Sequence, residues 1–158
     1  MADSIKERIL ANYETALKAV TVANGYKRTL NLVDRFQVGG MEQNFPVVVE
    51  VKQGVDIASE SLASIGNAGA EGHTMALFTI IKFRHDPSED GLSTSKVGIE
   101  HEEDVYRAAL ADRTRGGLAF DTRWISTDEM EVDEDGNRAV LAVNFEIDYR
   151  HLLGDMTL

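Results

Sequence analysis

The stretch from Gly116 to Arg150 constrains the fold more than any other, because its pattern indicates one long β-hairpin. In its second half, large apolar residues alternate with polar ones, which places the apolar set on one face of a strand. That set is Leu141, Val143, Phe145, Ile147 and Tyr149. The first half, from Leu118 to Asp128, is rich in β-branched and aromatic residues, and Asp133 to Asn137 supplies turn residues. Such a long hairpin cannot cover its own apolar face, so other segments must pack on it.

The composition predicts a single globular domain. The chain has 158 residues, of which 43% are hydrophobic and 27% charged, so it can bury a substantial core. Cysteine is absent, which excludes disulfides, thiolate nucleophiles and Cys-based metal sites. The N-terminus lacks the apolar core of a signal peptide, and no apolar run is long enough to span a membrane. We therefore expect a protein that is made and used in the cytoplasm.

The formal net charge of −11 argues against a nucleic-acid-binding protein, because such proteins neutralise phosphates with Lys and Arg. Arg113, Arg115 and Arg123 lie close together in the sequence, but Asp112 and Asp121 interrupt them. A surface of acidic residues would instead repel DNA.

The N-terminal half predicts one helix and two strands. Ser4 and Glu7 have capping-box spacing, and an apolar stripe at three- and four-residue steps predicts a helix from Ser4 to Ala23, which ends at Asn24-Gly25. Alternation from Arg28 to Phe36 and the valine run from Pro46 to Val51 predict strands. The residues between them, Gln37 to Phe45, are expected to form a projecting hairpin loop.

The segment from Lys52 to Gly72 has little pattern and is rich in Gly, Ala and Ser, so we interpret it as a projecting loop or contact arm. Next, His73 to His85 predicts a strand that is apolar on both faces in its middle. Such a strand is buried between layers or against another subunit. A turn-rich loop follows from Asp86 to Ser95. The next segment has acidic residues at its start and basic residues near its end, as the helix dipole favours, so it predicts a helix from Gly98 to Arg113 that ends at Gly116-Gly117.

This order of elements predicts an α+β fold. We expect a mostly antiparallel sheet of about five strands, two helices packed on one face, and the long β-hairpin at the end.

The sequence carries few signs of catalytic or metal chemistry. The histidines His73, His85, His101 and His151 lack the spacing of a helical metal site, and each is expected at the surface or at a strand end. The segment from Asp133 begins like a calcium loop, but Arg138 and Asn144 stand where Gly and Glu are needed. We therefore expect no catalytic residues, no cofactor and no bound metal.

Several short segments together carry a resemblance to a known family. They are Ala23-Asn24-Gly25-Tyr26 after the first helix, Arg35 at the end of a strand, the strand Pro46 to Val51, Gly116-Gly117-Leu118-Ala119-x-Asp121-Thr122 after the second helix, and the closing Ile147-Asp148-Tyr149-Arg150. In this order, from about Ser4 to Arg150, they resemble the tail terminator proteins of long-tailed bacteriophages. The long segment from Lys52 to Gly72 departs from the pattern of that family.

The resemblance implies a structural, non-enzymatic virion protein. Its subunits would form a homo-hexameric ring that caps the head-proximal end of the tail tube, stops tube polymerisation and joins the tail to the head connector. The implied partners are sister copies, the tail tube protein and a head-closure or connector protein, without any membrane. DNA would pass through the lumen without specific binding. The implied location is the tail or neck of the virion, after synthesis in the host cytoplasm.

Two sets of residues follow from this expectation. The candidate subunit interface comprises the exposed side of the two-faced strand and the contact segments, namely Phe45, Val55, Ile57, Leu62, Ile65, Phe78, Ile80 and Arg123. As a hypothesis, acids of the final hairpin face the lumen and keep DNA from adhering: Asp128, Glu129, Glu131, Asp133 and Glu134. Other interpretations are a different neck component, such as a head-closure or tail-completion protein, a small hydrolase or binding enzyme using His101 and nearby carboxylates, and a monomeric adaptor domain.

Overall fold

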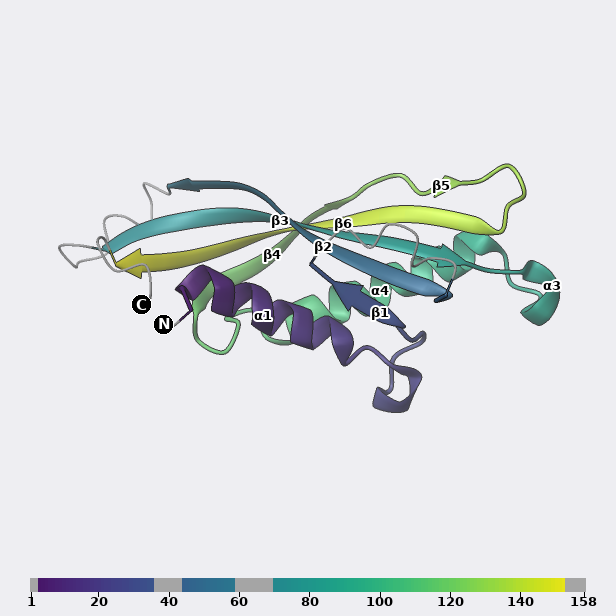
Figure 1. Cartoon of the computed structure of the whole chain (residues 1–158), viewed down its shortest axis with the longest axis horizontal. Coiled ribbons are helices and arrows are strands. Elements are labelled where there is room, and N and C mark those ends of the chain that lie inside the picture. The colour runs from purple at the N-terminus through teal and green to yellow at the C-terminus, as the bar shows by residue number, and fades with distance from the viewer. Residues whose placement is uncertain (1–2, 36–43, 59–69, 153–158) are drawn as a thin grey trace.

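The computed structural model describes residues 3–35, 44–58 and 70–152, and it shows an elongated α+β fold (Figure 1). The elements in chain order are the helix α1 (Ile5–Lys18), the 3₁₀ helix η1 (Val22–Asn24), the strands β1 (Leu32–Asp34), β2 (Val47–Ala58) and β3 (Ala70–Arg84), the helices α3 (Pro87–Asp90) and α4 (Thr94–Ala111), and the strands β4 (Ala119–Thr127), β5 (Glu131–Val132) and β6 (Arg138–Leu152). The predicted fold class is confirmed.

One six-stranded sheet organises the described residues. Its order is β1-β2-β3-β6-β4, and the short β5 pairs with β6 as well. All pairs are antiparallel except β1 with β2, which run parallel. The predicted hairpin pairing of these two strands across Gln37 to Phe45 is therefore wrong, because a hairpin joins antiparallel strands. Residues 36–43 of the connection lie outside the described residues. Short apolar runs carry no information about strand direction, so the sequence could not distinguish the two pairings.

The closing hairpin matches its prediction closely. β4 and β6 pair antiparallel, and Gly136 in the connecting turn has φ of 73°. The side chains of β6 alternate as expected, since the apolar set is buried and the residues between are half-buried. The long hairpin is indeed covered on one face by the rest of the chain.

The predicted arm from Lys52 to Gly72 is wrong at both of its ends. Residues 52–58 continue β2, and residues 70–72 begin β3, so these stretches are paired strands rather than a loop. Residues 59–69 lie outside the described residues. The polar residues and Gly54 in this part of β2 break the alternating pattern, which is why the strand was not recognised.

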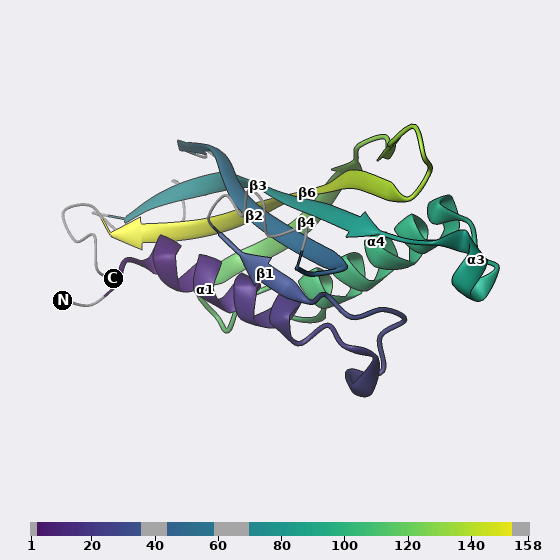
Figure 2. The same ribbon diagram turned by 45° about the vertical axis from the view of Figure 1, so that its right-hand side comes forward.

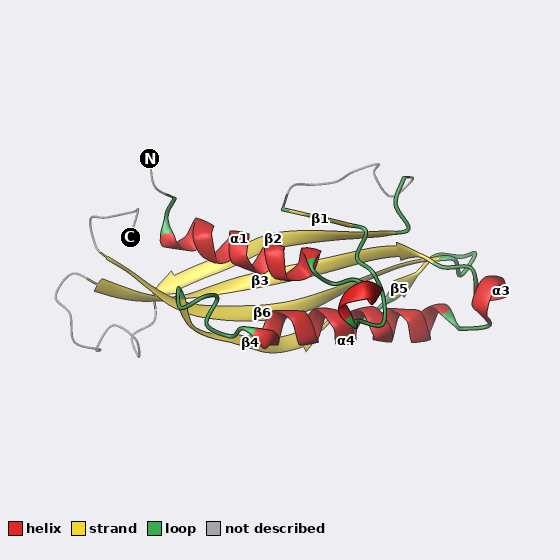
Figure 3. Cartoon of the chain, turned by 90° about the horizontal axis from the view of Figure 1, so that it is seen from below, coloured by secondary structure: helices red, strands yellow, loops and turns green. Residues whose placement is uncertain are grey.

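Both main helices pack on the same face of the sheet, as Figures 2 and 3 show. The core between them includes Ile9, Tyr13 and Leu17 of α1, Val105 and Ala109 of α4, and Leu77, Ile81, Phe145 and Ile147 of the sheet. The buried hydroxyls of Tyr13 and Thr79 are 2.6 Å apart and hydrogen-bond across the interface between α1 and β3. The Tyr13 ring also packs edge-on against Phe145. These contacts fix α1 along the sheet.

The helix boundaries differ from the predicted ones. Ser4 caps α1 by accepting a hydrogen bond from the backbone of Glu7, as expected, but the helix ends at Lys18 and η1 follows. Gly25 adopts the predicted left-handed conformation after η1. The second helix, α4, begins at Thr94 because Ser93 provides an N-cap that the sequence analysis overlooked.

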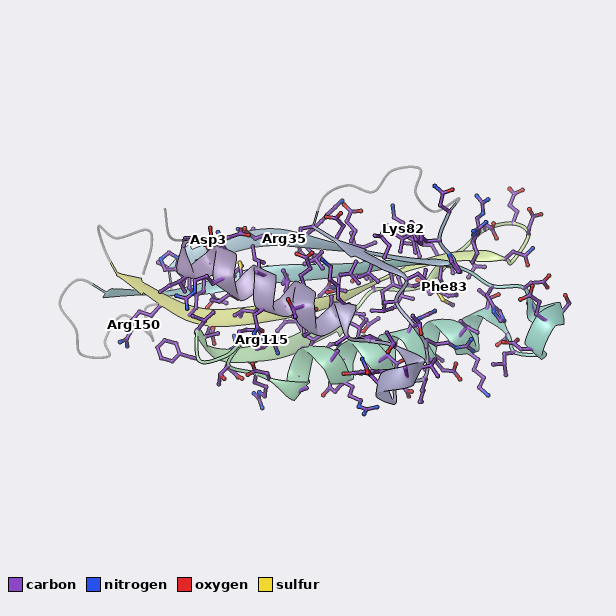
Figure 4. The ribbon with its side chains drawn as sticks, turned by 60° about the horizontal axis from the view of Figure 1, so that its bottom comes forward. Asp3, Arg35, Lys82, Phe83, Arg115 and Arg150 are labelled. Carbon is purple, nitrogen blue, oxygen red and sulfur yellow. The ribbon has the colours of Figure 1, made fainter. Side chains whose placement is uncertain are left out.

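Polar ties hold α4 in place. The buried carboxylate of Asp104 accepts hydrogen bonds from the backbone N–H groups of Lys27, at 3.1 Å, and Arg28, at 2.7 Å. Just after the C-terminus of the helix, the buried guanidinium of Arg115 donates to the carbonyl of Ala109 (Figure 4). Burial lowers the pKa of Arg115, although a cation at a helix C-terminus is favoured by the helix dipole. The first contact fixes the middle of α4 to the segment after η1, and the second fixes the segment after α4 to the last turn of the helix.

Candidate interaction surface

No helix of the described residues covers the second face of the sheet, which we call the open face (Figure 1). Alternation along β3 buries Leu77 and Ile81 against the helices and leaves Phe78 and Ile80 on the other side. The open face comprises Ala76, Phe78, Ile80 and Lys82 of β3, and Val140, Ala142, Asn144, Glu146 and Asp148 of β6. The Phe78 side chain is 38% exposed. The prediction of a strand that is apolar on both faces is confirmed.

Gly54 leaves room for the aromatic ring of Phe78 over the neighbouring strand β2. A Cβ atom at Gly54 would be only 2.5 Å from Cε2 of Phe78 and 3.1 Å from Cβ of Ala76. Gly54 lies in a β-bulge of β2, between Gln53 and Asp56. The absence of a side chain at Gly54 therefore makes the space that the exposed ring of Phe78 occupies.

The opposite orientation of neighbouring residues is clear at Lys82 and Phe83, both labelled in Figure 4. Phe83 is buried against the helices, whereas Lys82 lies on the open face near Glu50. The carboxylate of Glu50 is almost fully buried and lies 3.1 Å from the ammonium of Lys52 and 4.0 Å from that of Lys82. Two lysines thus compensate this buried carboxylate.

Another part of the open face carries a compact charge cluster. Arg123 of β4 donates to Asp148 and, at 3.1 Å, to Glu146 on the neighbouring β6, and the hydroxyl of Thr74 donates to Asp148 at 2.7 Å. The hydrogen bond to Asp148 raises the pKa of Arg123, and that to Glu146 adds to the effect. The predicted interface residue Arg123 is therefore engaged within its own chain.

The structure brings some predicted interface residues together and separates others. Phe78 and Ile80 lie on the open face, and Val55 and Ile57 are exposed near the end of β2. Phe45 is half-buried and lines a small cavity of about 130 Å³ with Lys82, Arg84 and Val140, among others. Leu62 and Ile65 lie outside the described residues.

Sequence reasoning missed a second set of exposed apolar residues on the edge strand β4. Phe120, Trp124 and Ile125 are 46%, 44% and 47% exposed. Phe120 and Ile125 each occupy a shift in the register of β4 against β6, which is a β-bulge. The sequence indicates which β4 residues are exposed only through the alternation expected along a strand. This alternation fails at the two bulges, so the exposure of Phe120 and Ile125 could not be predicted from it.

The five predicted lumen acids are all exposed, and all lie on the connection between β4 and β6, β5 included. Asp128 accepts a hydrogen bond from the amide of Asn144, at 2.8 Å. Asp133 accepts from the backbone N–H groups of Asn137 and Arg138, so it shapes the turn. The five acids therefore lie on one exposed segment of the chain, residues 128–134.

His101 is a core residue, contrary to the expectation that it lies at the surface. Its side chain is 2% exposed, and its ring packs 4.9 Å from the ring of Phe83. Burial lowers the pKa of His101 to about 4, and the charge of Arg28 adds to this effect. The neutral imidazole is therefore part of the packed contact between α4 and the sheet.

A polar cluster joins the N-terminus of α1 to the sheet. The carboxylate of Asp56 accepts hydrogen bonds from Lys6 and Tyr149, both at 2.7 Å, and lies 3.2 Å from Nδ1 of His73. Burial acts to raise the pKa of Asp56, but these hydrogen bonds hold it below its usual value. The cluster anchors the outer half of β2.

Within residues 3–35, 44–58 and 70–152, no group of three or more His, Asp or Glu side chains is arranged to hold a metal ion. Among the helices of the same ranges, none combines the length and apolarity needed to cross a membrane. The chain matches no protein-family model, and no curated protein resembles it significantly in sequence.

Proposed function

We propose that this chain is a structural subunit of a bacteriophage neck. Six copies form a ring that caps the tail tube, stops its polymerisation and joins the tail to the head connector. The copy number and the location in the virion rest on the resemblance to tail terminator proteins. The geometry of the described residues supports the more general part, which is self-assembly.

The observation that carries the proposal is the apolar centre of the open face. Phe78 presents a large ring to solvent, seated on Gly54 and flanked by Ile80 and Ala76. Exposed apolar patches on soluble domains mark interaction sites, and aromatic side chains are enriched at the centres of interfaces. A surface of this kind buries its apolar area when sister copies assemble.

The acidic connection between β4 and β6 fits the same proposal. If Glu129, Glu131 and Glu134 line the ring, their charge repels the DNA phosphates that pass through the lumen. The DNA then moves without being held. The outer surfaces of the ring remain for the tail tube protein and for the head connector.

The first test measures the mass of the purified chain by light scattering. One copy has a mass of 17.4 kDa, and a closed six-copy ring would have about 100 kDa. Phe78→Asp places a charge at the apolar centre of the open face and should reduce the ring to smaller species. The matched control is Ile99→Asp, which changes an exposed apolar residue of α4 and should leave the mass unchanged.

The second test concerns termination itself. Virions produced without this protein should show overlong tails or tails without heads by electron microscopy. Supplying the wild-type chain should restore normal particles, whereas Phe78→Asp should restore fewer than Ile99→Asp does. Normal particles in the absence of the protein would contradict the proposed function.

A further inference from the structure

The two outer strands of the sheet expose apolar side chains at positions where edge strands are usually protected. Natural sheets protect their edges with charges and with bulges that twist the strand away. Here β4 and the outer half of β2 contain three bulges, and each turns a large apolar residue outward. These residues are Phe120 and Ile125 on β4 and Val55 on β2.

Both edges have backbone that no strand pairs in the described residues. β1 pairs with β2 only at residues 48–50, which leaves the outer edge of residues 51–58 without a strand beside it there. On the other side of the sheet, β4 pairs with β6 alone. The two free edges have similar lengths, since β4 runs from Ala119 to Thr127.

The directions of the strands match the two edges to each other. β2, β3, β6 and β4 are each antiparallel to the next, so β2 and β4 run in opposite directions. A second copy rotated about an axis along the strands keeps its strand directions. Its β2 then lies antiparallel beside β4 of the first copy, which continues the alternation of the sheet.

The charges at both edges are compensated within the chain. Arg113 donates two hydrogen bonds, of 2.7 and 2.8 Å, to the carboxylate of Asp121. Arg123 forms ion pairs with Asp148 and Glu146. On the β2 edge, Asp56 is paired with Lys6 and hydrogen-bonded to Tyr149. The exposed acids of the β4–β6 connection contribute to the net charge of −11 but are not part of the β4 edge. Copies can therefore meet edge to edge without bringing uncompensated like charges together.

We infer that β4 of one copy docks against residues 51–58 of β2 in the next copy, with Phe120 and Ile125 packing against Val55 and Ile57. The two patches differ, so the contact is head-to-tail and closes into a ring when the rotation per copy allows it. This inference rests on the proposed function for its premise that the copies assemble. It adds which two surfaces make the contact. The ring of Phe78 lies over Gly54, within residues 51–58, so Phe78 belongs to the β2 side of this contact together with Val55 and Ile57.

Cysteine cross-linking tests the inference directly, because the chain has no cysteine of its own. Purified Ile125→Cys and Val55→Cys chains are mixed and treated with a short thiol-reactive bifunctional reagent. The double variant, which carries both changes in one chain, is treated separately. We expect cross-linked pairs in the mixture and, from the double variant, a ladder of products that ends at the ring. The matched control replaces Val55→Cys with Ile99→Cys, an exposed position on α4, and should give no pairs above background.

The outcomes separate this inference from the proposed function. Pairs from Ile125→Cys alone, without pairs in the mixture, would overturn the inference in favour of a two-fold contact between β4 edges. A ring mass by light scattering without any ladder would overturn the inference and leave the ring itself intact. A single-copy mass without a ladder would overturn the inference and count against the ring.

Discussion

The two faces of the sheet place the same kinds of residue in opposite environments. Phe145 on the covered face is 1% exposed and packs against Tyr13, whereas Phe78 on the open face is 38% exposed and rests on Gly54. Both belong to long central strands with alternating patterns. An apolar residue in a strand can therefore serve either the fold or assembly. Whether other elements of the same chain pack on it distinguishes the two roles.

The largest expected effect comes from the covered face. Phe145→Ala removes a fully buried ring and should lower the free energy of unfolding by about 3–5 kcal/mol, through lost burial and a residual cavity. Chemical denaturation followed by circular dichroism measures this change. A loss below about 1 kcal/mol would mean that the covered face is not a packed core.

Because His101 is buried on the covered side, we expect the free energy of unfolding to depend on pH through this residue. Its pKa is about 4 in the folded chain, against 6.5 for the free side chain. As the pH falls from 6.5 to 4, the unfolded chain binds a proton at His101 that the folded chain does not. The free energy of unfolding should therefore fall by about 1.4 kcal/mol per pH unit in this window, or about 3 kcal/mol in all.

Unfolding measured across this pH range in wild type and in His101→Gln checks the prediction. The variant should have a lower stability near neutral pH but a flatter dependence on pH below 6.5. Parallel curves for the two proteins would show that another group is responsible for the acid sensitivity.

A polar group on the helix side should matter more than a polar group on the open face. Asp104→Ala leaves two backbone N–H groups without their acceptor and should cost about 1–3 kcal/mol. Arg123→Ala on the open face breaks partly exposed ion pairs and should cost about 1 kcal/mol or less. The control for Asp104 is Glu103→Ala, which removes only an exposed pair with Lys27. Equal losses for Asp104→Ala and Arg123→Ala would mean that polar groups on the two faces contribute alike to stability.

Much of the covered side could be predicted from the sequence. The alternation from Leu141 to Tyr149 and the turn at Gly136 identify the final hairpin, because a half-buried strand and its turn leave a local pattern. The cap at Ser4 was also visible for the same reason. In contrast, the burial of His101 depends on Phe83, which lies in another element, and no local pattern reports that contact.

The candidate site was less accessible to prediction. The outward side of β3 was predicted correctly, since Phe78 and Ile80 interrupt an otherwise simple alternation. The bulges at Phe120 and Ile125 were missed, because a bulge is a property of two paired strands and not of one sequence segment. The parallel pairing of β1 with β2 was missed because direction is set by the path of the chain in space.

A substitution on the open face should change the stability of the subunit least, and it separates the roles of the two faces most directly. Phe78→Ala removes the same ring as Phe145→Ala, but the ring is partly exposed, so the free energy of unfolding should change by about 1 kcal/mol or less. Denaturation of the two variants side by side measures the difference between the faces. If the open face serves assembly, the mass measured by light scattering should fall in Phe78→Ala even though the subunit stays folded. A variant that unfolds as readily as Phe145→Ala would mean that Phe78 is a core residue, and the assignment of its face to assembly would then lose its basis.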